Sequence, residues 1–222
     1  PYTQGGSGTD VFTETLAAAL EKKGHSARTT RFAHNFQYAP WLLSRVAPPA
    51  GTDLVLANSW NAFVFKRSGV PLVAVEHLLV LDPALAPFRS TAQAVFHKLM
   101  VSHYERSTRD RADQLVAVSE YTARTYAQAL GSKPKVILNG IDTEFFCPSA
   151  QPEDTAPHDG GRPFRLVFVG NINRPKGADL LPPIMEELGD GYELRFTGPV
   201  EGNKLIRPSR SLIPTGRLDR HA

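Results

Sequence analysis

Short apolar runs that alternate with segments of helical periodicity constrain the fold of this 222-residue chain more than any other feature. The runs consist mainly of Val, Leu, Ile, Ala and Phe, and each gives way to Gly, Pro, Asn or charged residues. Such runs are typical of parallel strands that helices cover on both faces. Strands are predicted at residues 25–32, 53–58, 71–77, 114–119, 135–138, 164–169 and 192–197. Helices are predicted at residues 11–23, 60–67, 88–109, 120–130 and 178–188.

A change of composition divides the chain into two lobes. Residues 147–163 are rich in Pro, Asp and Gly, which predicts a linker. Residues 1–146 then form an N-terminal Rossmann-like lobe, and residues 164–222 form part of a second α/β lobe. The chain begins on a glycine loop and stops where a helix begins. We therefore expect the first strand and the C-terminal half of the second lobe to be missing.

The composition excludes several classes of protein. The formal net charge of +3 favours anionic ligands but provides no basic stripe of the kind that nucleic-acid binding needs. The single cysteine, Cys147, excludes an internal disulfide, and we interpret it as incidental. The sequence holds no spacing of His and Cys typical of a metal site, so neither a metal nor another cofactor is expected. No segment is long and apolar enough to span a membrane.

The clearest candidate site follows the strand at residues 164–169. Gly170 provides a turn, Asn171 follows it, and the basic side chains of Arg174 and Lys176 precede a helix that is predicted to open near Gly177. Free backbone N–H groups at a helix start, together with fixed cations, suit a phosphate or diphosphate. Fixed cations also stabilise the charge that develops on a departing diphosphate, without a metal. The alternative interpretation is a solvated helix start with surface charges.

A second glycine loop precedes the predicted helix at residues 11–23. Gly5 and Gly6 open this loop, and glycines let the backbone approach a ligand closely. Gly6 and Gly8 match the first two glycines of the dinucleotide-binding fingerprint, but Val11 stands where the third glycine belongs. The loop is therefore either a ligand contact or a capped turn.

Glu76 and His77 end the strand at residues 71–77, where polar side chains of an α/β fold are well placed for an acceptor or another substrate. The alternative for His77 is a partly buried imidazole bonded to the backbone. Basic residues also crowd the long helix that follows. They can dock an anionic membrane surface or an acidic partner, although such a run is usually a solvated face. They are Lys98, His103, Arg106, Arg109 and Arg111.

Four segments in this order give the chain its resemblance to bacterial nucleotide-sugar glycosyltransferases of family 4, which have the two-lobed GT-B fold. The segments are Gly5–Gly6 before a helix, residues 115–120 (LVAVSE), residues 136–142 (VILNGID) with a Phe and Pro148 after them, and residues 169–177. The resemblance implies transfer of a sugar, with retention, from a nucleotide diphosphate to an acceptor hydroxyl. It also implies synthesis of a cell-surface polysaccharide or glycolipid in the cytoplasm, at the inner face of the membrane where the acceptor is lipid-linked.

The resemblance assigns roles to particular residues. Lys176 matches the lysine that binds the donor diphosphate, and His77 matches a histidine near the transferred sugar. Gly6 matches the glycine loop that faces the diphosphate. Gly198 and Pro199 resemble the loop near the nucleobase, and Gly216 resembles a glycine in the same region.

Two departures from the family qualify these assignments. Asn171 stands where the family usually has Arg, so Arg174 is the candidate replacement. The family's two donor-binding glutamates would lie beyond Ala222, so this chain alone is expected to be inactive. Two other functions remain open, an NADP-dependent oxidoreductase with Arg31 at the 2′-phosphate and a non-catalytic module that binds a phosphosugar.

Overall fold

The computed structural model describes residues 1–3, 8–148, 162–198 and 204–216. It divides into two compact units, Pro1–Asp142 and Thr143–Ala222. The predicted linker at residues 147–163 falls in the second unit, and its residues 149–161 lie outside the described part of the chain.

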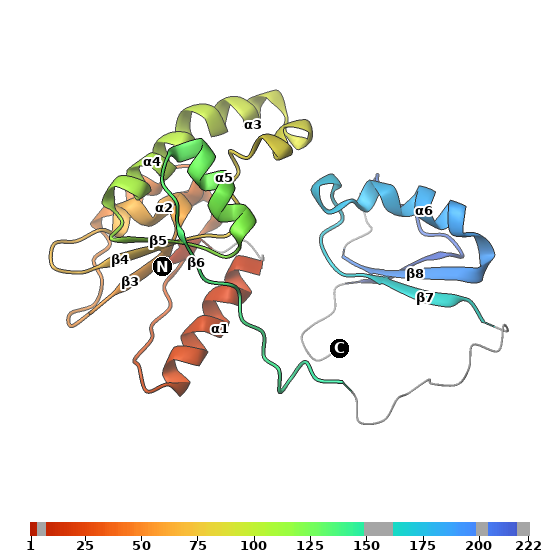
Figure 1. Ribbon diagram of the computed structural model, residues 1–222, viewed down its shortest axis with the longest axis horizontal. Coiled ribbons are helices and arrows are strands. Elements are labelled where there is room, and N and C mark those ends of the chain that lie inside the picture. Colours follow the sequence, from red (N-terminus) through yellow and green to blue (C-terminus); the bar gives the residue numbers. More distant parts are fainter. Residues whose placement is uncertain (4–7, 149–161, 199–203, 217–222) are drawn as a thin grey trace. The chain divides into compact units, whose positions relative to one another are not determined.

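A four-stranded parallel sheet organises the first unit (Figure 1). Its strands are β3 (Val55–Asn58), β4 (Leu72–Glu76), β5 (Gln114–Ala117) and β6 (Lys135–Val136), which neighbour one another in that order. The register pairs Asn58 with Val75 and Glu76 with Ala117, so the carboxyl ends of these strands meet at one edge. This edge carries Glu76 and His77, the polar pair that the sequence places after a strand.

Figure 1 shows α2, α4 and α5 on one side of this sheet and α1 on the other. Their bounds are α1 (Gly8–Lys22), α2 (Ser59–Ala62), α3 (Thr91–Phe96), α4 (Ser102–Arg111) and α5 (Glu120–Leu130). Shorter 3₁₀ turns span His34–Gln37, Pro40–Arg45, Phe63–Phe65 and Pro83–Phe88. In the described residues, no helix has both the length and the apolar character that crossing a membrane requires.

A π-helical turn, His97–Val101, joins α3 and α4 into one long helix. Of the apolar side chains at helical spacing in the predicted helix 88–109, Phe96 and Met100 pack against the core, whereas Val95 and Leu99 are 52% and 63% exposed. The side chains that are buried are Val101, Tyr104, Glu105 and Thr108. A π turn adds one residue to the helical repeat and so shifts which side chains face the core, which a constant 3.6-residue period does not anticipate.

The first unit also contradicts the prediction that no strand precedes the glycine loop. Strand β1 (Tyr2–Thr3) pairs in parallel with β2 (Arg31–Phe32). The two strands form a sheet of their own, separate from β3–β6. A cavity of about 740 Å³ lies between α1 and the chain around β3. Because of this gap, α1 contributes no fully buried residue to the core.

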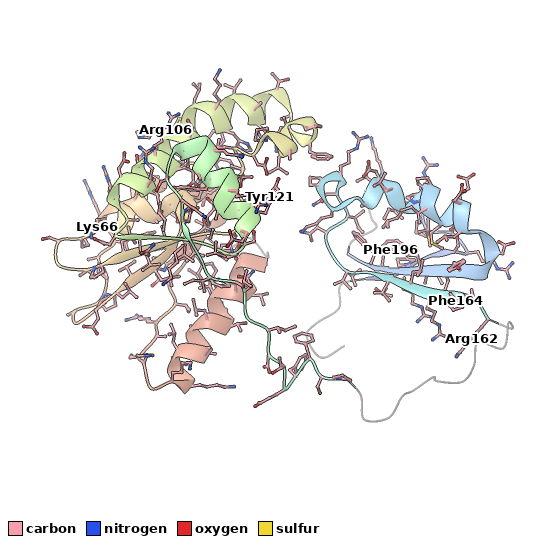
Figure 2. The ribbon with its side chains drawn as sticks, viewed as in Figure 1. Lys66, Arg106, Tyr121, Arg162, Phe164 and Phe196 are labelled. Carbon is pink, nitrogen blue, oxygen red and sulfur yellow. The ribbon has the colours of Figure 1, made fainter. Side chains whose placement is uncertain are left out.

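The second unit has a three-stranded parallel sheet, in the order β7 (Phe164–Phe168), β8 (Tyr192–Thr197) and β9 (Leu212–Gly216). Helix α6 (Leu181–Leu188) lies along one face of it, and the buried side chain of Phe196 lies between the two (Figure 2). The helix begins at Leu181, later than predicted, because Pro182 and Pro183 lack N–H groups and fit only its first turn. In the described part of this unit, 3₁₀ turns span Arg174–Lys176, Ala178–Leu180 and Gly189–Gly191.

Candidate functional site

Three predicted donor-side glycines come together beyond the carboxyl ends of β7, β8 and β9. The amide of Gly198 donates to the carbonyl oxygen of Gly216 at 3.1 Å. A Cβ atom at Gly198 would lie 3.3 Å from the carbonyl oxygen of Gly170, and the φ angle of Gly198 is +111°, a region that favours glycine. The amide of Gly170 donates to Thr197 Oγ1 at 3.0 Å. This edge is therefore built from close backbone approaches, and Pro199 lies outside the described residues.

The turn that follows Gly170 satisfies most of its own backbone amides. The side chain of Asn173 accepts from the amide of Lys176 at 3.1 Å, and its carbonyl oxygen accepts from the amide of Ala178 at 3.2 Å. Gly177 takes the left-handed conformation, and its amide bonds to the carbonyl of Arg174 at 2.8 Å. The prediction of free N–H groups at this turn is therefore wrong for residues 176–178. A phosphate would be held here mainly by side chains.

The two cationic side chains of this turn are accessible. Arg174 lies 3.9 Å from the carboxylate of Asp179, and both side chains are solvent-exposed, so the ion pair is weak. Lys176 is exposed and has no ion-pair partner within the described residues. Asn171 is also exposed at the start of the turn. A phosphate can therefore bind the side chains of Arg174 and Lys176 without breaking a buried interaction.

His77 lies at the corresponding edge of the first unit, directly after β4. Its imidazole packs against the ring of Phe12, with ring centroids 4.6 Å apart and planes at 76°. Burial lowers the pKa of His77, which favours a neutral imidazole at pH 7. Phe12 belongs to α1, the helix that follows Gly5 and Gly6, although both glycines lie outside the described residues.

Glu76 is buried, unlike an acceptor contact that a ligand could reach. Its side chain is 4% exposed, accepts from Ser59 Oγ at 2.8 Å and accepts from the amide of Leu78 at 3.1 Å. Burial raises the pKa of Glu76 to about 7. The acceptor-side position predicted for Glu76 therefore needs correction. Its carboxylate lies inside the unit and accepts a hydrogen bond from the loop that begins at His77.

A second buried carboxylate, Glu105 on α4, was missed by the sequence analysis. Its Oε1 lies 3.2 Å from Ser59 Oγ, and its Oε2 has no hydrogen-bond partner among the described residues. Burial and the nearby charge of Glu76 raise the pKa of Glu105 well above its ordinary value. The spacing of Val101, Glu105 and Thr108 is the signal that could have revealed this buried face, but only with the helical phase after the π turn.

Other predicted groups have structural partners. Arg31, the candidate contact for a 2′-phosphate, donates to Glu14 at 2.9 Å and is engaged in that ion pair. Arg109 bonds the carbonyl of Leu130 at 2.7 Å, and Arg111 lies 5.8 Å from the centre of the Phe63 ring. The predicted membrane-docking cluster therefore loses Arg109 and Arg111 to local packing. In the part of the chain that the structure describes, no group of three or more His, Cys, Asp or Glu is arranged to hold a metal.

The chain belongs to the class of α/β proteins with two units, and each unit has a parallel sheet with candidate residues at its carboxyl edge. The family model described as Glycosyltransferase Family 4 matches residues 27–145, more than half of the chain, and the chain belongs to that family. The parallel sheets and the family together confirm the predicted α/β fold of the GT-B type.

Two curated proteins show how far the similarity extends. The chain is 29% identical over 153 residues to D-inositol 3-phosphate glycosyltransferase 1 of Catenulispora acidiphila. The matched residues make up 60% of the chain and 33% of that protein. It is 25% identical over 209 residues to the glycogen synthase of Thermus caldophilus, which covers 75% of the chain and 47% of that enzyme. The chain therefore spans about a third and about half of the lengths of these relatives.

Proposed function

We propose that this protein acts as a glycosyltransferase that moves a sugar from a nucleotide diphosphate to an acceptor hydroxyl with retention. The second unit binds the donor, and the first unit binds a saccharide or lipid-linked acceptor. The reaction belongs to the synthesis of a cell-surface polysaccharide or glycolipid in the cytoplasm, at the inner face of the membrane where the acceptor is a lipid. One of the two relatives is named a glycosyltransferase and the other a glycogen synthase, which supports this assignment.

One observation carries the proposal, the combination of a glycine-built sheet edge with two accessible cations. Gly170, Gly198 and Gly216 contribute no side chains of their own to this edge, so a ligand can approach their backbone closely. Arg174 and Lys176 follow directly on the turn. A flat base and ribose fit a bare backbone edge, and a diphosphate fits a guanidinium and an ammonium group.

The chemistry follows from where charge develops. As the bond between the anomeric carbon and the diphosphate breaks, the leaving oxygen takes the electron pair and becomes more negative. Lys176 and Arg174 stabilise that charge more in the transition state than in the bound donor, which raises the rate without a metal. His77, held neutral by burial against Phe12, donates a hydrogen bond to the transferred sugar or its acceptor.

The experiment is a thermal-shift screen of the protein against UDP, GDP, ADP, TDP and NADP. A ligand that binds only the folded state stabilises it by about 2.7 kcal/mol at a hundredfold excess over its dissociation constant. We expect one nucleoside diphosphate to raise the melting temperature, and we expect Lys176→Ala to remove most of that shift. The control is Lys22→Ala, which removes an equal charge from the last turn of α1.

Each other outcome separates the competing functions. Stabilisation by NADP alone would favour the oxidoreductase, against which the engagement of Arg31 with Glu14 already argues. A diphosphate shift that is equal in Lys176→Ala and the parent chain would remove Lys176 from the donor site. No response to any of the five nucleotides would contradict donor binding by this chain and favour the non-catalytic module.

A further inference from the structure

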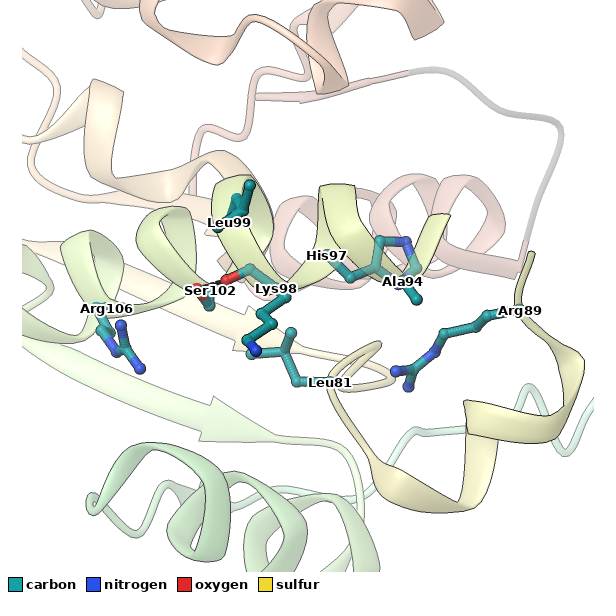
Figure 3. Close-up of a pocket in the computed structure, with 8 residues that line it drawn as sticks. All are labelled: Leu81, Arg89, Ala94, His97, Lys98, Leu99, Ser102 and Arg106. Atoms are coloured by element: carbon teal, nitrogen blue, oxygen red, sulfur yellow. Dashed lines mark hydrogen bonds between the residues drawn. The ribbon is translucent and has the colours of Figure 1, made fainter. Parts of the chain in front are cut away.

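A basic pocket of about 400 Å³ lies on the first unit, and two of the basic residues that the sequence singles out on the long helix, Lys98 and Arg106, line it (Figure 3). Its walls come from the long helix and from the loop between β4 and α3. Figure 3 shows Lys98 on the helix and Arg89 on the loop with their charged ends directed toward Leu81, and Arg106 further along the same helix. Leu81 lies four positions after His77, so the loop that leaves the candidate acceptor site forms one wall of this pocket.

The charges of this pocket are unbalanced. Arg89, Lys98 and Arg106 line it, and no Asp or Glu does. Within the described residues, none of these three cations forms an ion pair. Three like charges around one space repel one another, and an anion bound between them converts that repulsion into attraction.

The pocket is also partly prepared for a ligand. Arg89 donates to the carbonyl oxygen of Asp82 at 2.6 Å, which fixes its guanidinium group at the pocket wall. The reciprocal bonds of Ser90 and Gln93 cap α3 directly after it. His97 lines the same wall, and its ring packs against Trp60 with ring centroids 6.1 Å apart.

We propose that this pocket binds the phosphate group of a phosphorylated acceptor, either a soluble phosphomonoester or the head group of a phospholipid. A phosphomonoester has the charge and the acceptor oxygens that an ammonium and two guanidinium groups match. That the phosphate belongs to an acceptor rests on the proposed transferase function. Anion binding by the pocket itself does not depend on it.

The first test is an NMR titration of the protein with inorganic phosphate and with glycerol 3-phosphate at constant ionic strength. We expect saturable shifts at the backbone amides of Arg89, Lys98 and Ser102, with roughly millimolar affinity. The double variant Lys98→Gln/Arg106→Gln should weaken binding by about tenfold or more, since it removes two charged contacts. Lys22→Gln is the matched control and should bind as the parent does. Lys98 and Arg106, the two substituted cations, are exposed, so the double variant should keep its melting temperature.

A second arm distinguishes the source of the phosphate. Phosphatidylcholine vesicles are compared alone, with phosphatidic acid, and with phosphatidylglycerol at equal surface charge. Preferential capture by phosphatidic acid that is lost in Lys98→Gln/Arg106→Gln identifies a lipid head group, whereas binding of glycerol 3-phosphate without vesicle capture identifies a soluble acceptor. Absence of binding to every phosphate probe, or binding that is equal in the double variant, would overturn the proposal.

The outcomes for the two proposals are separable. Nucleotide binding is tested through Lys176, which belongs to the other unit. If phosphate binds the pocket while all five nucleotides fail to stabilise the protein, only the transferase function is lost. If a nucleotide stabilises the protein while phosphate leaves the pocket amides unmoved, only the pocket proposal is lost.

Discussion

Glu76 and Glu105 meet at the hydroxyl group of Ser59 in the interior of the first unit, although they lie 17 and 46 positions after it in the chain. Ser59 Oγ lies 2.8 Å from Glu76 Oε2 and 3.2 Å from Glu105 Oε1. A hydroxyl donates one proton, so it can bond one carboxylate fully, and the pair is most stable when at least one acid holds its own proton. This relationship connects α2, the end of β4 and α4, and its residue Glu76 directly precedes His77 in the chain.

The stability of the first unit should fall as pH rises from about 4.5 to about 7. Burial raises the pKa of Glu76 from its ordinary 4.5 to about 7, so the folded state binds more protons than the unfolded state in that range. Stability is then fully present below the unfolded pKa and is lost as pH rises to the folded pKa. The shift corresponds to about 3 kcal/mol, and the raised pKa of Glu105 acts in the same direction.

The measurement is urea denaturation followed by tryptophan fluorescence, which reports the first unit because Trp41 and Trp60 both belong to it. In the double variant Glu76→Gln/Glu105→Gln the fall in stability between pH 5 and pH 7 should largely disappear. The exposed pair Glu21→Gln/Glu187→Gln is the control and should keep it. A parent chain whose unfolding free energy is constant over this range would contradict the raised pKa.

Ser59→Ala should destabilise the first unit more above pH 7 than at pH 5. Loss of the hydroxyl removes the donor to Oε2 of the buried Glu76 and leaves the Leu78 amide as donor to Oε1, and such a loss typically costs about 1–3 kcal/mol. At pH 5 the protonated acids can donate to one another, and the loss is smaller. The same fluorescence measurement at both pH values tests this, with the exposed Ser68→Ala as a control. An equal loss at both values would show that Ser59 contributes packing and not a bond to an ionised acid.

Gly198→Ala should destabilise the second unit by about 1–3 kcal/mol, because an L-residue is strained at its φ angle. The added Cβ would also lie 3.3 Å from both the carbonyl oxygen of Gly170 and Cγ1 of Ile172. Gly191→Ala is a matched control, since a Cβ there meets nothing within 4 Å and its φ angle is not in the left-handed region. Hydrogen exchange of the Phe196 amide in β8 measures the effect, and equal exchange in both variants would contradict the close approach at this sheet edge.

The sequence predicted the bounds of helices and strands whose end residues are recognisable, such as a capping serine or a terminating glycine. Helix α5 begins after Ser119, which caps it, and ends at Gly131 in the left-handed conformation, and both bounds were predicted. Strand β8 also has its predicted bounds, Tyr192–Thr197. The buried face of α4 was not predicted, because a π turn inside the helix changes the phase of the side chains that follow it.

Of the candidate site, too, the sequence predicted only the parts that follow from local patterns or from general rules of the fold. The sequence predicted Gly170, Gly198 and Gly216 as separate donor-side residues, and their close approach follows from a general property of parallel sheets, that their carboxyl ends share an edge. The acid pair depends on contacts between residues far apart in sequence, so no local pattern announces it. The backbone amides of residues 176–178 bond within their own turn because Asn173 caps it and Gly177 is left-handed. The prediction of a simple helix start included neither feature.

Phe12→Ala should raise the pKa of His77 toward its ordinary value of 6.5. Burial is what lowers that pKa, and the Phe12 ring, 4.6 Å from the imidazole, is part of what excludes water from it. An imidazole that charges more readily near pH 7 would donate from both nitrogens, and it would add a positive charge beside the acceptor site. Phe12 is only half-buried on a helix without fully buried residues, so the unit should remain folded.

The test follows the His77 ring protons by NMR from pH 4.5 to pH 8 in the parent chain, in Phe12→Ala and in the control Phe88→Ala. Phe88 is 44% exposed and has no ring contact with His77, so its removal should leave the titration unchanged. If the pKa of His77 is the same in all three proteins, the Phe12 ring does not keep the imidazole neutral. A rise in Phe12→Ala alone would show that α1, the helix that follows the glycine loop, sets the protonation state of His77.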